Sequence, residues 1–365
     1  RRLIDQDQSV RVRVAESELL LQQDSVILSR NHSTMSKRKA PSADNVNHDF
    51  CEFLIELADF EKNVSRNIHK HSAYRKAANV LATHPTRIKS GDEARKLNGI
   101  GAKIAEKIDE FLQTGKLRKL DNIRNDDTSK AVNEMTRVTG IGPAKAQELV
   151  RAGIKTIEDL EKNKDKLTHH QLIGLKYVTD FEQKIPRSEI EEIEAVIRKE
   201  LSKLDPDYLI TICGSYRRGK AESGDIDVLI THPNFTSVNK SKELASKLLK
   251  KVVTCLETQK LITDTLSLGD VKFMGVCKVR TVARRIDIRL TPHDQYHCAT
   301  LYFTGSDMFN KEMRTHALAN GFTLNEYCLR PMGSTGLAGK PVEIDSERDI
   351  FEYINFPYKN PSERG

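Results

Sequence analysis

Two short segments alternate charged and apolar residues, and this alternation constrains the fold more than any other feature of the sequence. Asp225-Ile-Asp227 opens a run that ends in Val-Leu-Ile, and in Arg284–Leu290 the residues Arg285, Asp287 and Arg289 alternate with isoleucine and leucine. Successive side chains of an extended strand point to opposite faces, so each segment predicts a strand with one apolar and one charged face. We therefore predict that neighbouring strands bring three aspartates together on one side of a sheet.

Three clustered carboxylates point to metal-dependent phosphoryl transfer. Carboxylates without an intervening base repel one another, which raises a pKa, and a divalent cation is their natural companion. Three aspartates can hold two Mg²⁺ ions roughly 4 Å apart, an arrangement that activates one oxygen and stabilises the leaving one. The preceding Gly214-Ser215 turn supplies a hydroxyl and backbone amides, and Arg217 and Arg218 supply guanidinium forks that match phosphate geometry. The combination favours nucleotidyl transfer over an exposed strand end, which is the simpler explanation for an isolated Asp-x-Asp.

A repeated Gly-Ile-Gly motif suggests contact with a nucleic-acid backbone. Leu97–Ile108 and Val138–Leu149 each contain an apolar residue, Gly-Ile-Gly and an amphipathic helix. Neither copy follows a predicted strand, which argues against a dinucleotide-binding fold. The pattern instead predicts a helix-hairpin-helix motif, whose glycines allow close approach and whose helix N-terminus faces a phosphate. Such contacts carry no base information, so they suit non-specific DNA binding; a helix packing corner is the alternative.

The periodicity of apolar residues changes midway along the chain. Helical spacing, as in Phe50, Phe53, Leu54, Leu57 and Phe60, runs from Asp49 to about residue 123 and continues to Pro186. The second half reads as mixed α and β. It contains a predicted helix over 188–204 and predicted strands over 209–213, 226–231, 271–276, 285–290 and 300–303.

Composition limits the class of protein. With 365 residues, 38% hydrophobic and 30% charged, the chain is long enough for two or more domains. No apolar run approaches the ~20 residues of a membrane span and no signal peptide is evident, so we expect an intracellular protein. Six cysteines never form a Cys-x-x-Cys pair, which predicts free structural thiols. Of the net charge of +7, residues 35–121 carry 17 Lys and Arg against 12 Asp and Glu, which suggests a polyanionic partner or a solvated basic face.

The start of the chain reads as a leader. Residues 1–34 contain no methionine, whereas Met35 opens MSKRKAP like a natural start. We interpret 1–34 as leader sequence, and Lys37–Lys39 as either a nuclear import signal or a flexible charged tail.

From Met35 to Gly365 the sequence resembles the X family of DNA polymerases, in particular its small beta-type repair members. The motifs that carry the resemblance include AYRKAA, KIAEKIDEF, TGKLRKL, GSYRRG, GDIDVL, KFMGVC, RRIDIRL, YFTGSD and FNKEMR. The resemblance implies a multidomain α+β fold with four parts. These are a helical lyase domain with the first hairpin (35–122), a helical DNA-binding subdomain with the second (123–186), a catalytic nucleotidyltransferase subdomain (187–293) and a nascent-base-pair subdomain (294–365).

The resemblance also implies roles for individual residues. Asp225, Asp227 and Asp287 would hold two Mg²⁺ ions, or Mn²⁺, with Asp287 accepting the proton of the primer 3′-hydroxyl. The residues for the deoxynucleoside triphosphate would be Lys184, Ser215, Arg218, Ser223, Gly224 and Asp225 at the phosphates, and Tyr302, Phe303, Gly305, Asp307 and Asn310 at the sugar and base. Arg314 would contact the template, and Arg289 and Glu326 would couple subdomain closure to the metal site. Backbone carbonyls would bind Na⁺ or K⁺ at Arg95, Leu97, Ile100, Thr136, Val138 and Ile141.

A lysine cluster would form the lyase site. Lys103 and Lys107 lie four residues apart and share a helix face, and a crowd of cations lowers the pKa of an amine and frees it for Schiff-base formation. From the residues alone Lys103, Lys107 and Lys119 all remain possible nucleophiles; the resemblance selects Lys107. The supporting residues would be His69, Lys70, Tyr74, Lys76, Lys103, Glu106 and Lys119.

Together these features predict a gap-filling repair polymerase with 5′-deoxyribose phosphate lyase activity in base excision repair. The expected partners are gapped or nicked double-stranded DNA with a 5′-phosphate, deoxynucleoside triphosphates and other repair proteins, with no membrane, and the expected state is a monomer in the nucleus or also the cytoplasm. The alternatives are a template-independent terminal transferase of the same family and a DNA-binding module with an inactive transferase half. The sequence departs from the family at Lys184, where an arginine is usual, at Leu268, where a basic residue is usual, and in a shorter linker before Asp287.

Overall fold

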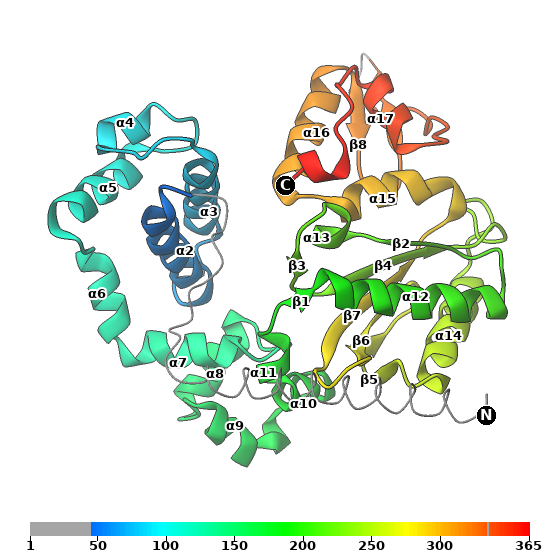
Figure 1. The fold of residues 1–365 in the computed structure, drawn as a ribbon, viewed down its shortest axis with the longest axis horizontal. Helices are drawn as coiled ribbons and strands as arrows, with labels where there is room; N and C mark the ends of the chain where they lie inside the picture. The colour runs from blue at the N-terminus through cyan, green and yellow to red at the C-terminus, as the bar shows by residue number, and fades with distance from the viewer. Residues whose placement is uncertain (1–44, 334–335) are drawn as a thin grey trace, which may run out of the picture. The chain divides into compact units, whose positions relative to one another are not determined.

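The computed structural model describes residues 45–333 and 336–365, which divide into two compact units. The first unit contains the described residues up to Ala58 together with Ser72–Leu117, and the second contains Asp59–His71 and Arg118–Gly365. Element labels follow Figure 1. The predicted leader and the basic cluster Lys37–Lys39 lie outside the described residues.

Helices make up the first unit, as the sequence predicts. Phe50, Leu54 and Leu57 are fully buried, and the rings of Phe53 and Phe111 lie 5.1 Å apart in the same core. The helices that contribute to this unit are α2 (His48–Asn63), α3 (Ile68–Thr83), α4 (Gly91–Arg95) and α5 (Ala102–Thr114).

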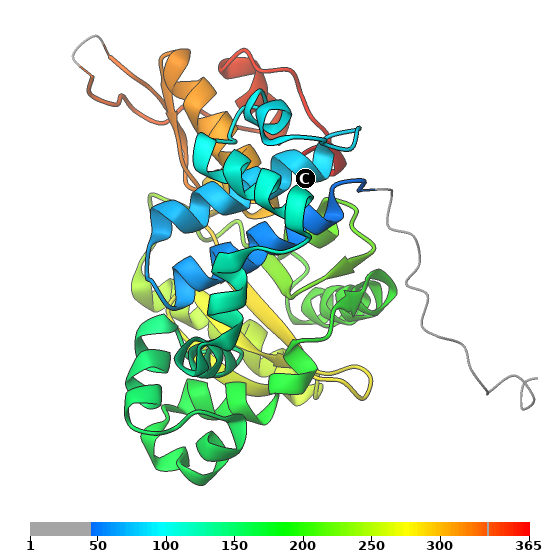
Figure 2. The same ribbon diagram turned by 90° about the vertical axis from the view of Figure 1, so that its left-hand side faces the viewer.

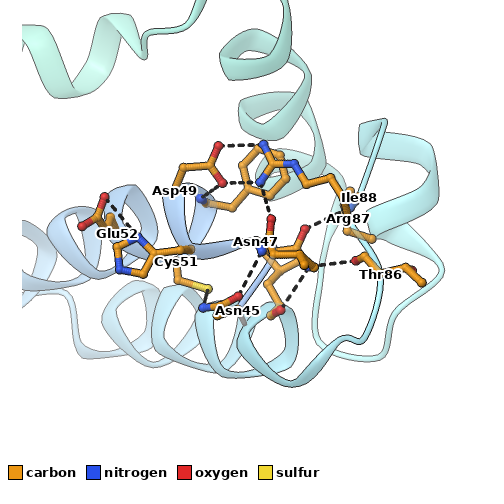
Figure 3. A network of polar contacts seen from close by, with 12 residues as sticks. Asn45, Asn47, Asp49, Cys51, Glu52, Thr86, Arg87 and Ile88 are labelled. Carbon is orange, nitrogen blue, oxygen red and sulfur yellow. Dashed lines mark hydrogen bonds and ion pairs between the residues drawn. The ribbon is translucent and has the colours of Figure 1, made fainter. Parts of the chain in front are cut away.

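A polar network ties the start of α2 to the segment before α4 (Figure 3). The side chain of Asn47 accepts a hydrogen bond from the backbone of Ile88 and donates one to the carbonyl of Thr86, both at 2.9 Å. Arg87 donates two hydrogen bonds to Asp49, one of them at 2.6 Å. Because these bonds bridge residues about forty positions apart, they fix a loop that its own sequence would leave free.

The second unit begins with a helical part. Its core contains Val132, Met135, Val138 and Leu149, all nearly inaccessible to solvent. The elements are α6 (Arg118–Asn125), α7 (Asp127–Thr136), α8 (Pro143–Arg151), α9 (Ile157–Lys162), a 3₁₀ turn (Lys164–Lys166), α10 (His169–Lys176) and α11 (Val178–Phe181).

A five-stranded mixed sheet follows, in the order β2-β4-β7-β6-β5. The pair β4 and β7 is parallel and the other neighbours are antiparallel. Two long helices, α12 and α14, cover one face of the sheet (Figure 1), where they pack on Ile226, Val228, Ile286 and Ile288. The elements are β1 (Ile185–Pro186), α12 (Arg187–Leu204), β2 (Leu209–Ile212), α13 (Gly214–Arg217), β3 (Glu222–Ser223), β4 (Ile226–Thr231), α14 (Lys242–Thr258), β5 (Ile262–Leu268), β6 (Lys272–Cys277) and β7 (Arg284–Leu290).

A small α/β part ends the chain (orange and red in Figures 1 and 2). Its core is built around Phe309 and Phe351, both buried. The elements are a 3₁₀ turn (His293–Gln295), α15 (Tyr296–Thr304), α16 (Asp307–Ala319), β8 (Phe322–Leu324), β9 (Leu329–Pro331), α17 (Glu347–Tyr353) and a 3₁₀ turn (Pro361–Glu363).

The predicted strand over 300–303 is wrong, because these residues belong to helix α15. The helix buries Ala299 against the sheet and Leu301 against the C-terminal core, so packing on two sides outweighs β-propensity. The hydroxyls of Thr300 and Thr304 donate to carbonyls one turn earlier, at 2.8 and 2.5 Å, which satisfies them inside a helix.

The multidomain α+β class is confirmed, as are the predicted helix over 188–204 and four of the five predicted strands. Strands β1, β3, β5, β8 and β9 and helices α14, α16 and α17 were not predicted. None of the helices in the described part of the chain is long and apolar enough to cross a membrane.

Candidate active site

Three aspartates meet on the sheet face that α12 and α14 leave uncovered. Asp227 of β4 and Asp287 of β7 are direct partners in the parallel register, and Asp225 immediately precedes β4. Their apolar neighbours Ile226 and Ile286 point to the helices on the other face. The side chains of the three aspartates therefore lie on one face of the sheet, as the alternation in the sequence predicts.

Burial and mutual repulsion set the electrostatics of this cluster. Burial, then the charges of Asp225 and Asp287, raise the pKa of Asp227 to about 7. Burial, then the charge of Asp287, also raise the pKa of Asp225. A divalent cation would relieve both costs, because it stabilises the ionised form of each carboxylate. The residues present therefore fit a divalent metal.

Two basic side chains hold Asp287. Lys272 of β6 lies 3.0 Å from one carboxylate oxygen of Asp287, and Arg285, which is on β7 like Asp287, lies 2.5 Å from the other. Strand alternation puts Arg285 on this face, but Lys272 requires the antiparallel register of β6 and β7, which the sequence does not reveal. A cavity of about 50 Å³ adjoins the cluster, lined by Cys213, Asp227, Val228, Leu229, Lys272, Asp287, Arg289 and Phe303.

Gly214 is required by its position beside the cluster. Its φ is +60°, and a Cβ atom there would lie 2.6 Å from the Oδ2 atom of Asp227. A side chain would both strain the backbone and displace the carboxylate. The Gly-Ser turn therefore approaches the aspartates as closely as backbone can.

Next to this turn, polar groups form a candidate phosphate cradle. The Ser215 hydroxyl lies 2.8 Å from that of Ser223. Arg218 donates from Nη1 to the carbonyl of Thr304 at 2.6 Å, while its Nε is buried and has no hydrogen-bond partner among the described residues. Burial lowers the pKa of Arg218. A buried, unpaired guanidinium N–H is costly unless an acceptor arrives, so the geometry fits an anionic ligand.

Lys184 stands at the edge of the cradle. Its ammonium nitrogen lies 3.8 Å from the place that a Cβ would take at Gly224. Its charge also opposes the rise in the pKa of Asp225, after the larger effects of burial, Asp287 and Arg285. The structure thus brings Lys184 and Gly224 together with the aspartates.

Arg217 does not belong to the cradle, contrary to the reading of both arginines as phosphate forks. Its guanidinium donates to both carboxylate oxygens of Glu347, one at 3.0 Å, and to the Thr304 hydroxyl at 2.7 Å. The fork is occupied by the protein itself. Nothing in the sequence indicates this pairing, because Glu347 lies 130 residues from Arg217.

The predicted sugar- and base-binding residues gather at the junction of α15 and α16. Tyr302 and Phe303 end α15, Gly305 follows it in a cis peptide with Ser306, and Asp307 begins α16. Asn310 donates to the carbonyl of Tyr302 at 2.8 Å.

Two predicted arginines contact this junction, and the predicted Glu326 contacts one of them. The Arg289 guanidinium lies 4.7 Å from the ring centre of Phe303. Arg314 lies 5.4 Å from the ring of Tyr302 and 3.7 Å from a carboxylate oxygen of Glu326. Arg314 and Glu326, which the resemblance gives separate roles, form an ion pair here.

The two Gly-Ile-Gly motifs adopt the same local geometry. Gly99 and Gly140 have φ of +106° and +91°, and the helices that follow, α5 and α8, begin after glycine caps without side-chain hydrogen bonds. In each motif the first apolar carbonyl, Leu97 or Val138, accepts a hydrogen bond from the isoleucine amide, at 3.2 and 2.9 Å. Each motif carries one set of the carbonyls predicted to bind Na⁺ or K⁺. The first unit contains Arg95, Leu97 and Ile100, and the second contains Thr136, Val138 and Ile141.

The predicted lysine cluster is divided between the units. In the first, Lys107 donates to the carbonyl of Lys103 at 3.1 Å and Lys76 packs at Gly99; Glu106 is exposed and Tyr74 buried. In the second, Lys119 and Lys70 lie 2.6 and 4.0 Å from Glu61, and His69 is exposed. The Glu61 side chain is 2% exposed, and it was missed because a glutamate on the buried side of a helix breaks the apolar pattern.

A separate acidic cluster lies at the opposite end of the sheet. Ligand atoms of Asp205, Asp207 and His232 are within 4.8 Å of one another. Asp205 accepts hydrogen bonds from the backbone of Asp207 and from His232 Nε2, both at 3.0 Å, and His232 Nδ1 accepts one from the backbone of Asn234. These bonds close the turn between α12 and β2 and account for the cluster.

Comparisons with known proteins agree with this architecture. Four segments of the chain match models of known protein families. These are a helix-hairpin-helix domain (45–117), the fingers domain of DNA polymerase lambda (133–182), the DNA polymerase beta palm (184–293) and the DNA polymerase beta thumb (299–365).

Proteins that align with most of this chain support the same family. DNA polymerase lambda of Arabidopsis thaliana is 33% identical over 88% of this chain and 62% of its own length, and that of Rattus norvegicus is 36% identical over 88% and 57%. A DNA nucleotidylexotransferase of Xenopus laevis is 27% identical over 87% of the chain and 67% of its own. This chain thus spans about three fifths of the polymerase lambda relatives. With the mixed sheet, its three aspartates and the paired hairpins, these matches show that the chain belongs to the X family of DNA polymerases.

Proposed function

We propose that this protein is a template-directed, gap-filling DNA polymerase of base excision repair that also carries 5′-deoxyribose phosphate lyase activity. The observation that carries the polymerase proposal is the trio of Asp225, Asp227 and Asp287 beside Arg218, whose buried Nε has no partner in the described chain. Carboxylates that repel and a cation that lacks an acceptor are together complementary to a metal-bound triphosphate.

Each group then has a defined task. Asp225, Asp227 and Asp287 would hold two Mg²⁺ ions, or Mn²⁺, which supply charge neutralisation and orientation for in-line displacement at the α-phosphorus. Asp287 would accept the proton of the primer 3′-hydroxyl. Ser215, Arg218 and Lys184 would bind the triphosphate, and the Tyr302–Asn310 junction would enclose the sugar and base.

The DNA-binding motifs support a duplex substrate. The two hairpins present helix N-termini whose amides are uncapped by side chains, which suits phosphate contacts with a DNA backbone. We propose that the carbonyls at Leu97 and Val138 and their neighbours bind Na⁺ or K⁺ there. The proposed substrates are gapped or nicked DNA with a 5′-phosphate and deoxynucleoside triphosphates, and the proposed location, by family membership, is the nucleus.

Lys107 is the proposed lyase nucleophile. Its Nζ lies on the exposed side of α5 beside Lys103, within reach of solvent. Attack on the C1′ aldehyde of an abasic sugar releases water and forms a Schiff base, and loss of a C2′ proton then expels the 3′-phosphate from the sugar.

A template-independent transferase is the second candidate, because a nucleotidylexotransferase is among the relatives. One-nucleotide-gap extension with each triphosphate separately distinguishes the two. A polymerase adds only the complementary nucleotide; a terminal transferase adds all four and extends single strands.

Replacement of Asp287 tests the catalytic site. Asp287→Ala should lower the rate of nucleotide addition by about a thousandfold, since the loss of metal-based charge stabilisation costs several kcal/mol. Binding of gapped DNA should change little. A variant that retains near-normal addition would show that the metals are held elsewhere, and a variant that no longer binds DNA would point to a structural role.

Borohydride trapping tests the lyase. The protein should form a covalent adduct on an incised abasic site, and Lys107→Ala should reduce it at least tenfold while Lys103→Ala leaves most of it. Undiminished trapping by Lys107→Ala would assign the nucleophile to another lysine.

A further inference from the structure

A groove on the outer side of helix α14 has no part in the proposed chemistry. Its volume is about 620 Å³, and the residues that define it include Leu204, Lys247, Lys250, Lys251, Cys255 and Thr258. Leu204 comes from the end of α12, which lies beside α14 on the same sheet face (Figure 1). The catalytic aspartates lie on the opposite face, so a molecule in this groove would leave them accessible.

The groove runs lengthwise along α14. Positions 247, 251, 254 and 258 recur every three or four residues and therefore form one stripe on the helix surface. The intervening Leu248, Leu249 and Val252 are buried against the sheet. From Lys247 to Thr258 the stripe extends about 16 Å at 1.5 Å per residue, a length that suits a second helix better than a compact small molecule.

The charged side chains that line the groove are all positive. Three exposed lysines line it and no carboxylate does. Within the described residues, none of the three ammonium groups has a hydrogen bond or a close ion pair; the charge of Lys251 lowers the pKa of Asp205 from a longer distance. Leu204 is 38% exposed, and with Cys255 and the threonine methyl groups it gives the groove an apolar floor.

We propose that this groove, the α14 groove, binds an acidic amphipathic helix of a partner protein. Leucine-like side chains of the partner would enter between Leu204, Cys255 and Thr258, and its carboxylates would face Lys247, Lys250 and Lys251. DNA fits less well, because phosphate recognition gains nothing from an apolar floor, whereas a helix with one apolar and one acidic edge uses both features. The partner and the DNA substrate would bind on opposite faces of the sheet and at the same time.

A designed peptide tests this proposal. The probe is a fluorescent 14-residue peptide with leucine at every third or fourth position and glutamate between, and the comparison peptide has lysine in place of glutamate. Anisotropy should show saturable binding of the acidic peptide alone. Lys247→Glu/Lys250→Glu/Lys251→Glu should weaken it about tenfold or more, since each exposed ion pair contributes a factor of a few. The matched control Lys199→Glu/Lys242→Glu/Lys260→Glu makes the same charge change outside the groove and should bind normally.

Cys255 provides an independent readout of occupancy. It is the single cysteine of the six that is not buried, so a maleimide should label it first. The acidic peptide should slow this labelling, in parallel with the anisotropy. Circular dichroism and gap-filling rates should be unchanged in both triple variants, which confirms folding.

Three results would overturn the proposal. They are no binding of the acidic peptide up to about 1 mM, equal loss of binding in the control triple, or weaker binding of gapped DNA by the groove triple but not by its control. The last result would make the groove a DNA surface instead. None of these results bears on the polymerase proposal, which the gap-filling assay tests separately.

Discussion

Asp227 and Glu347 are carboxylates of the second unit that are largely removed from water, but their surroundings have opposite charge. Asp227 faces two further carboxylates, and burial together with these charges raises its pKa to about 7, although the charges of Lys272 and Arg285 oppose the rise. Burial would also raise the pKa of Glu347, but hydrogen bonds and charges from Arg217 and Arg364 outweigh it and lower the pKa. One carboxylate is left with excess like charge, which suits a metal, and the other is neutralised within the protein.

The neutralised site joins distant parts of the second unit. Glu347 of α17 accepts from Arg217 of α13 and, at 2.8 Å, from Arg364 near the C-terminus. Arg364 is 2% exposed and lies within 6 Å of the ring centres of Phe309, Phe351 and Tyr358. Its carbonyl also accepts from the backbone of Ser306. The contacts of Glu347 and Arg364 therefore fix α13, α17 and the C-terminal segment relative to one another.

Removing Glu347 should have the largest effect on stability. Glu347→Ala leaves the buried guanidinium of Arg364 and the mostly buried one of Arg217 without their carboxylate, and breaking a buried pair in this way costs about 3–5 kcal/mol. We expect a corresponding fall in the free energy of unfolding measured by urea denaturation. The exposed Glu343→Ala, four residues earlier on the same segment, should change it by less than about 0.5 kcal/mol. Equal values for the two variants would mean that water, rather than Glu347, solvates the arginines.

Neutralising Asp227 should raise the free energy of unfolding, whereas removing Glu347 should lower it. The folded-state pKa of about 7 lies above the ordinary aspartate pKa of 3.8, so the folded protein holds this proton more tightly than the unfolded chain does. This group therefore lowers stability as pH rises from about 4 to 7, with a plateau on either side. In chelator at pH 8, Asp227→Asn should stabilise the protein by up to about 4 kcal/mol, since each pKa unit corresponds to about 1.4 kcal/mol, while abolishing nucleotide addition.

Thermal unfolding across pH checks this prediction. The native protein should lose stability between pH 4 and 7 more steeply than Asp227→Asn, and excess Mg²⁺ should stabilise the native protein more than the variant. Parallel pH profiles would show that the repulsion at Asp227 is already relieved without metal.

The contrast explains which parts of the site could be predicted. The shared face of Asp225, Asp227 and Asp287 follows from strand alternation, a local rule that holds wherever one face is buried. Glu347 and Glu61 could not be found this way, because their partners are set by packing between distant segments. Arg217 and Arg218 are adjacent and chemically identical, yet one is neutralised and the other is not, and only the tertiary structure distinguishes them.

The fold shows the same limit. The helical character of residues 49–186, the helix over 188–204 and four strands were predicted, because burial on one face leaves a period in the sequence. Helices α14, α16 and α17 were not predicted. Helix α15 was mistaken for a strand, since its residues are buried on two sides and show no single period. Strand β5 was missed, and its pairing with β6 is interrupted at Ile262/Asp264 and Thr265/Ser267, where the alternation fails.

Replacement of Lys184 should have the smallest effect of these changes. It tests the phosphate cradle beside the three aspartates. The ammonium of Lys184 lies beside Gly224. Arginine can bind two phosphate oxygens at once, whereas lysine acts as a point charge. Lys184→Arg should lower KM for the incoming triphosphate about two- to fivefold with little change in kcat, because an added exposed contact is worth up to about 1 kcal/mol. Lys184→Met should raise KM. Steady-state gap filling over a range of triphosphate concentrations measures both. If arginine raised KM as methionine does, the lysine would act by fitting between Gly224 and Asp225 rather than by contacting the triphosphate, and the phosphate cradle would rest on Arg218 and Ser215.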